Sequence, residues 1–192
     1  GGSRPPLHLL CDGSYTDKWT LRNLPEDTTG IGRIRKDAKL SAKPKIRKLR
    51  GRTRFYGKDL PTPEQLRQDP DIPWTKVSVR ASGKTRDFDV KMITPVRWRA
   101  AGEMDLSVVV IRPKGFRPRK GARKSYTQPA YLICTDPTLP IEDILQEYVW
   151  RWDIEVNHRD EKTILGVGQA QVRNEHSVVN IPATAVAAFA IL

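Results

Sequence analysis

Four residues in the C-terminal quarter of the sequence, Tyr148, Arg151, Glu155 and Lys162, have a spacing that suits one face of a helix. At about 100° per residue, their offsets of 0, 3, 7 and 14 positions place them within roughly 60° of one another. An acid beside two cations and a phenol can form a surface ladder of ion pairs. The same set can bind a metal through its carboxylate while the cations hold phosphates. The spacing alone leaves both interpretations open.

A second acid with possible chemistry is Asp12, which follows the apolar run 7–11 and precedes Gly13. This pattern is typical of a buried strand that presents an acid at its carboxyl end. Phosphodiester chemistry on DNA uses carboxylates to hold two Mg²⁺ ions, which activate the attacking oxygen and stabilise the leaving oxygen. Asp12 and Glu155 are therefore the candidate ligands for Mg²⁺ or Mn²⁺.

The positive charge of the chain is concentrated in two segments, 33–54 and 112–124. The 192 residues have a formal net charge of +12, from 34 Lys and Arg against 22 Asp and Glu. The two segments together carry +17, so the rest of the chain is mildly acidic. This distribution indicates a polyanionic partner. Nucleic acid is favoured over a membrane surface because neither segment has the apolar face of an interfacial helix. Two solvated loops that only aid solubility are the alternative.

The elements expected around Asp12 are a strand, a helix and a second strand. Thr16 or Asp17 is the expected N-cap of a helix that ends at Pro25. The apolar side of this helix is expected to carry Trp19, Leu21 and Leu24. A further strand is expected at 31–34, and the order strand, helix, strand favours an α/β sheet.

The middle of the chain, from about residue 52 to residue 130, has the pattern of antiparallel β structure. Apolar and polar residues alternate there, or β-branched residues follow one another, between Pro and Gly. The predicted strands are 75–80, 88–93, 106–111 and 131–134. After Pro140 the pattern becomes helical and continues past Lys162. Cys11 and Cys134 lie in apolar runs and are interpreted as small core residues, not as a disulfide.

The run from Tyr148 to Lys162 matches the pattern Y-x2-R-x3-E-x6-K. It resembles the signature of bacterial insertion-sequence transposases of the DDE superfamily, which have an RNase H-like catalytic core. Asp12 and the residues around it resemble that family's second catalytic aspartate. The resemblance implies an α/β (α+β) fold in which an RNase H-like core portion is interrupted by a β-rich antiparallel insertion. The implied parts are a linker over 1–6, a strand-helix-strand over 7–40, a basic insertion over 41–135 and core helices over 136–192.

The same resemblance implies a DNA transposase that hydrolyses a phosphodiester at transposon ends and then transfers the strand. Asp12 and Glu155 would bind the metal. Trp152 would stack beside the signature arginine, and Tyr131 would receive a flipped base where the family has a tryptophan. The residues expected to contact DNA are Tyr148, Arg151, Lys162, Trp152, Tyr131, Arg33, Arg35, Lys36 and Lys39.

The family's first aspartate lies on an earlier strand, which the residues before Asp12 do not supply. We therefore expect a missing N-terminal part of the same protein, and an inactive chain without it. A competing alignment makes Asp12 the first aspartate and Asp136 the second. The expected partners are double-stranded DNA and a second copy of the chain, in the bacterial cytoplasm and at the nucleoid, with no membrane. The alternative function is a non-catalytic DNA-binding module derived from a decayed or domesticated transposase core.

Overall fold

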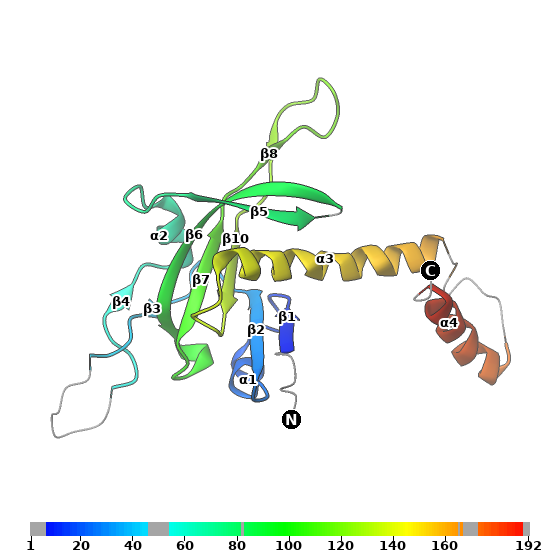
Figure 1. Ribbon diagram of the computed structural model, residues 1–192, viewed down its shortest axis with the longest axis horizontal. Coiled ribbons are helices and arrows are strands. Elements are labelled where there is room, and N and C mark those ends of the chain that lie inside the picture. Colours follow the sequence, from blue (N-terminus) through cyan, green and yellow to red (C-terminus); the bar gives the residue numbers. More distant parts are fainter. Residues whose placement is uncertain (1–6, 46–53, 82, 165, 167–172, 190–192) are drawn as a thin grey trace. The chain divides into compact units, whose positions relative to one another are not determined.

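Figure 1 shows the computed structural model, which describes residues 7–45, 54–81, 83–164, 166 and 173–189. For residues 152–154, 157, 158, 161 and 189 only the backbone is described. The chain forms two compact units, Gly1–Tyr148 and Val149–Leu192. The linker predicted over residues 1–6 lies outside the described residues.

One mixed sheet forms most of the first unit and has eight strands within the described residues. Its strand order is β1-β2-β10-β7-β6-β3-β4, and β5 pairs with β6. β1 and β2 run parallel, whereas the other paired strands run antiparallel. The strands are β1 (Leu7–Cys11), β2 (Thr28–Arg33), β3 (Leu40–Ser41), β4 (Asp59–Leu60), β5 (Thr75–Ala81), β6 (Lys84–Trp98), β7 (Leu106–Ile111) and β10 (Ala130–Cys134). The predicted mixture of α and β structure is confirmed.

The first unit begins with the predicted strand, helix and strand, in which α1 (Lys18–Arg22) connects β1 to β2. Asp17 is the N-cap, and its side chain accepts a hydrogen bond from the Thr20 backbone N–H at 2.8 Å. Leu21 is buried as predicted, but the prediction for Trp19 is wrong because its side chain is 75% exposed. Residues two positions apart point about 200° apart on a helix, so Trp19 and Leu21 cannot share one face.

Two glycines on β2 allow the segment after β1 to pack directly on the sheet. A Cβ atom on Gly32 would lie 2.2 Å from the Thr16 hydroxyl oxygen. A Cβ atom on Gly30 would lie 3.1 Å from a methyl group of Leu24. Side chains at these two positions would push the α1 segment away from the sheet. The glycines therefore help to position the turn that contains Asp12.

The predicted β-rich insertion is part of the same sheet as β1 and β2. β10 pairs with β2 on one side and with β7 on the other. All six residues of β7 are buried, which is typical of a central strand with both faces covered. The helix α2 (Pro63–Gln68) packs against this core through Leu66, which is fully buried. Residues 7–40 and 41–135 thus share one hydrogen-bonded sheet.

Two longer helices follow the sheet, α3 (Ile141–Thr163) and α4 (Glu175–Phe189). The helix predicted after Pro140 is confirmed, and it continues without interruption past Lys162. Its first turns belong to the first unit, where Ile144 and Leu145 are fully buried. A short 3-10 helix, η1 (Arg99–Ala101), separates β6 from β7. Among the described residues, no helix is long and apolar enough to cross a membrane.

Candidate functional site at the end of β1 and on α3

Asp12 lies directly after β1 and has an exposed side chain. Its backbone carbonyl accepts hydrogen bonds from the N–H groups of Tyr15 and Thr16 at 3.0 and 3.1 Å, and from the Thr16 hydroxyl at 3.0 Å. Among the described residues, its carboxylate accepts one hydrogen bond, from the Gly13 N–H at 2.7 Å. A carboxylate has about four acceptor sites. The turn therefore fixes the Asp12 backbone while the carboxylate keeps capacity for a cation.

Arg33 is the predicted cation that lies beside the Asp12 turn. β1 and β2 pair Cys11 with Gly32, so the next residues, Asp12 and Arg33, continue at the same level. A Cβ atom on Gly13 would lie 3.7 Å from the Arg33 Cβ, which confirms this proximity. Arg33 is half-buried and can hold a phosphate near Asp12.

Asp136, the acid of the competing alignment, lies at the opposite end of the sheet. β10 pairs Cys134 with Ile31, so Asp136 is level with Thr29, whereas Asp12 is level with Arg33. Four residue positions correspond to roughly 13 Å along a strand. The Asp136 carboxylate accepts hydrogen bonds from the N–H and hydroxyl of Thr138 at 2.8 and 2.7 Å, which lower its pKa. This geometry contradicts a metal site shared by Asp12 and Asp136.

The four signature residues all lie on the single helix α3, as predicted. Arg151 and Glu155 form an ion pair at 3.2 Å, one helical turn apart. The Glu155 side chain is 56% exposed and that of Arg151 is 14% exposed. Lys162 is exposed, but Tyr148 is only 5% exposed. The stripe therefore presents Glu155 and Lys162 to solvent, and little of Tyr148 is available to a phosphate.

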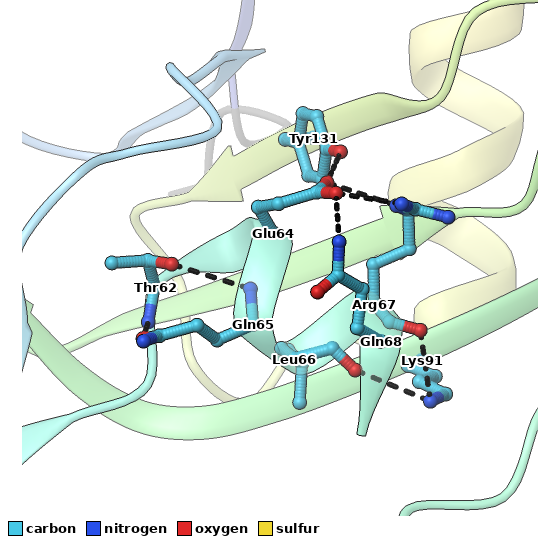
Figure 2. Close-up of polar contacts among 8 residues, drawn as sticks. All are labelled: Thr62, Glu64, Gln65, Leu66, Arg67, Gln68, Lys91 and Tyr131. Atoms are coloured by element: carbon cyan, nitrogen blue, oxygen red, sulfur yellow. Dashed lines mark hydrogen bonds and ion pairs between the residues drawn. The ribbon is translucent and has the colours of Figure 1, made fainter. Parts of the chain in front are cut away.

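Tyr131 is buried, and its hydroxyl donates to the Glu64 carboxylate (Figure 2). Arg67 donates two further hydrogen bonds to Glu64, at 2.9 and 2.6 Å, and Gln68 donates one at 2.7 Å. The hydrogen bonds from Arg67 and Tyr131 lower the pKa of Glu64 to about 2. Burial, followed by the bond to Glu64, raises the pKa of Tyr131 to about 12.

The structure does not present Tyr131 to solvent, where the predicted flipped base would stack on it. Stacking requires an exposed ring face, and the Tyr131 side chain is 6% exposed. Its position on β10 points it toward α2, where Glu64 holds the hydroxyl. The sequence showed an aromatic residue on a strand but not which face of the sheet α2 covers.

The remaining predicted DNA contacts are mostly exposed. Arg35 is 83% exposed and forms an ion pair with Asp37 at 3.0 Å, while Lys36 and Lys39 are exposed in the segment between β2 and β3. The Trp152 side chain lies outside the described part of the chain, as do residues 46–53 of the first basic segment.

The two predicted metal ligands belong to different units, Asp12 to the first and Glu155 to the second. Within the described residues, no group of three or more His, Cys, Asp or Glu side chains is gathered closely enough to hold a metal ion. Each carboxylate is exposed and offers the oxygen donors that Mg²⁺ and Mn²⁺ prefer. The Glu155 carboxylate also contacts Arg151, so a metal there would share or replace that contact.

A small ribbon of β8 (Gly115–Phe116) and β9 (Ser125–Tyr126) was not among the predicted elements. It presents two exposed aromatic side chains, Phe116 within the second basic segment and Tyr126 just after it. The alternation of aromatic residues with cations over 112–126 was the available signal.

No protein-family model and no curated protein matches this chain.

Proposed function

We propose that this chain is part of the catalytic core of a DNA transposase, which cuts a phosphodiester at transposon ends and joins the freed 3′-hydroxyl to target DNA. The observation that carries the proposal is the unbroken helix α3. All four residues of the Y-x2-R-x3-E-x6-K pattern lie on this helix, and Arg151 contacts Glu155. An exposed, conformationally fixed Asp12 at the carboxyl end of β1 supports it.

The RNase H-like core is part of this proposal. The parallel pair β1 and β2, joined by α1, is compatible with such a core, and the acid stands at the carboxyl end of the first of these strands. β1 has a partner on one side only within the described residues. The proposal includes a further aspartate, contributed by an upstream part of the same protein, and a dimer that brings two transposon ends together.

Asp12 and Glu155 would hold Mg²⁺ or Mn²⁺ through their carboxylates. The bound ions would supply an activated water and then an activated 3′-hydroxyl for attack on phosphorus. Arg151 keeps the Glu155 carboxylate in place through its ion pair. Arg33 and Lys162 would hold the DNA phosphates, because Arg33 lies beside Asp12 and Lys162 is exposed on α3.

The test uses the protein with its natural upstream sequence and a duplex that carries the transposon end. Strand cleavage is measured with Mg²⁺, with Mn²⁺ and with EDTA, and duplex binding is measured by fluorescence anisotropy. Asp12→Asn and Glu155→Gln should each abolish cleavage and leave the binding affinity within about threefold of wild type, because exposed carboxylates add repulsion, not attraction, toward phosphates.

Asp136→Asn is the matched control, since it removes a carboxylate at the other end of the same sheet. It should leave cleavage unchanged, whereas the competing alignment requires its loss. Retained cleavage in Asp12→Asn or Glu155→Gln would refute the proposed catalytic site. A wild-type protein that binds duplex DNA but never cleaves it would instead identify a non-catalytic DNA-binding module.

A further inference from the structure

The β8–β9 ribbon is an ordered projection from the sheet (Figure 1). Gly115 pairs with Tyr126, and the Thr127 N–H donates to the Lys114 carbonyl at 2.9 Å. At the tip, the Ala122 N–H donates to the Arg119 carbonyl at 3.1 Å, and Gly121 has a φ of +83° that favours glycine. The ribbon therefore holds its side chains in a defined arrangement.

The cations at the base of this ribbon have acceptor partners, whereas those at its tip are exposed. At its base, Arg112 lies 3.5 Å from Asp89, and the Lys114 ammonium donates to the Asp87 carbonyl at 3.1 Å. In the described part of the chain, the tip cations form no ion pair with an acid. These exposed residues are Arg117, Arg119, Lys120 and Arg123. Four like charges within seven residues repel one another, and a bound polyanion would relieve this repulsion.

Two exposed aromatic rings distinguish this ribbon from a loop that serves only solubility. The side chains of Phe116 and Tyr126 are 48% and 62% exposed, and the Lys124 ammonium lies 5.2 Å from the centre of the Tyr126 ring. Exposed rings among cations are the combination that binds bases or sugars together with phosphates. A two-stranded ribbon also has dimensions that fit the DNA major groove.

The ribbon and Asp12 lie at the same end of the sheet. The ribbon leaves β7 after Ile111 and enters β10 at Ala130, and these two residues pair with each other. Leu132 of β10 pairs with Arg33 of β2, which is level with Asp12. The base of the ribbon therefore lies two strands away from Asp12, which is roughly 10 Å across the sheet. It also lies two residues farther along the strand direction, which is roughly 7 Å. One turn of duplex DNA, about 34 Å long, can span both.

We infer that the β8–β9 ribbon is a second DNA-binding element, which contacts duplex phosphates through its tip cations while Tyr126 packs on a sugar or base. This inference shares the DNA partner of the proposed function but does not depend on cleavage. The ribbon contributes affinity and holds the duplex in register beside Asp12, and none of its side chains takes part in the chemistry.

The test compares two triple variants with equal loss of charge, in the protein with its natural upstream sequence. The ribbon variant is Arg119→Gln, Lys120→Gln and Arg123→Gln. The control variant is Lys58→Gln, Arg99→Gln and Arg173→Gln, at exposed positions outside the ribbon and the Asp12 turn. Affinity for a fluorescent duplex is measured at several salt concentrations, and circular dichroism verifies that both variants are folded.

The ribbon variant should bind at least tenfold more weakly at low salt, and its plot of log affinity against log salt should be shallower by about 2 to 3, near 0.9 per lost phosphate contact. The control variant should keep the wild-type slope within about 0.5. Tyr126→Leu should lower affinity about tenfold without changing the slope, because stacking is not electrostatic. Equal slopes for the ribbon and control variants would overturn the inference, as would tighter binding of a structured RNA than of the duplex.

The two hypotheses fail in different ways. Cleavage retained in Asp12→Asn would remove the proposed active site and leave the ribbon as a DNA-binding element. Wild-type binding by the ribbon variant would remove the inference and leave the active site in place. If both hold, cleavage by the ribbon variant should recover when the protein is raised to saturating concentration, whereas cleavage by Asp12→Asn should not.

Discussion

The two ends of the sheet in the first unit use their charged residues differently. At the end with Asp12, the acid has one hydrogen bond, and the nearby ribbon carries four exposed cations that form no ion pair within the described residues. At the opposite end, Asp105 contacts Lys43 and Arg97 at 2.6 and 2.8 Å, and His8 lies 3.1 Å from Glu147. The charges of Asp105, Lys43 and Arg97 satisfy one another, whereas the Asp12 carboxylate and the cations at the ribbon tip are available to a ligand.

The largest expected effect on stability comes from Gly32, which lets the turn that contains Asp12 pack against β2. Gly32→Ala places a Cβ atom in the space of the Thr16 hydroxyl, so we expect a loss of about 3 kcal/mol in the free energy of unfolding. Urea denaturation measures it. Gly13→Ala is the control, because its Cβ atom would meet only an ordinary 3.7 Å contact, and it should stay within about 0.5 kcal/mol of wild type. Similar losses in both variants would contradict the role assigned to Gly32.

A smaller effect on the free energy of unfolding should distinguish Asp105, at one end of the sheet, from Asp12, at the other. Asp105→Asn leaves the Arg97 side chain, which is 11% exposed, without its carboxylate partner. We expect a loss of about 2 kcal/mol in the free energy of unfolding, below the cost of breaking a fully buried pair because Asp105 is 22% exposed. Asp12→Asn should change the same quantity by less than about 0.5 kcal/mol. If Asp12→Asn were the more destabilising change, the contrast between the ends would be wrong.

An effect that appears only at low pH concerns the acid that holds Tyr131. The pKa of Glu64 falls from an ordinary 4.5 to about 2 in the folded protein, so folding favours the ionised form. This contribution to stability is complete above pH 4.5 and is lost as the pH falls toward 2. Glu64→Gln should flatten the decline in urea midpoint between these pH values. An unchanged pH profile in Glu64→Gln would show that other carboxylates govern the decline.

Local patterns in the sequence predicted much of the secondary structure. The spacing after Pro140 predicted α3, the capping side chains of Thr16 or Asp17 predicted the start of α1, and the alternation over 75–80 predicted β5. Each of these signals acts over fewer than about ten residues, within the range of helix caps and side-chain periodicity. The same kind of signal identified the basic segments and the exposed acid after β1.

Most of the incorrect predictions concern which segments, distant in sequence, contact one another in the fold. Tyr131 has the sequence pattern of a strand residue, but only the position of α2 decides that its hydroxyl meets Glu64, 67 residues earlier in the chain. The separation of Asp136 from Asp12 follows from the antiparallel pairing of β10 with β2. Trp19 is a different kind of miss, because the helical period itself excluded it from the face of Leu21.

The sequence by itself determined the residue types, the helix that carries Glu155 and the strand that ends at Asp12, because these depend on neighbours along the chain. The tertiary structure decided which acids share an end of the sheet, which aromatic rings are buried, and that the ribbon of cations and Tyr126 leaves the sheet at the Asp12 end. Those outcomes depend on the pairing register of distant strands, where the direction of β10 relative to β2 moves Asp136 to the far end of the sheet.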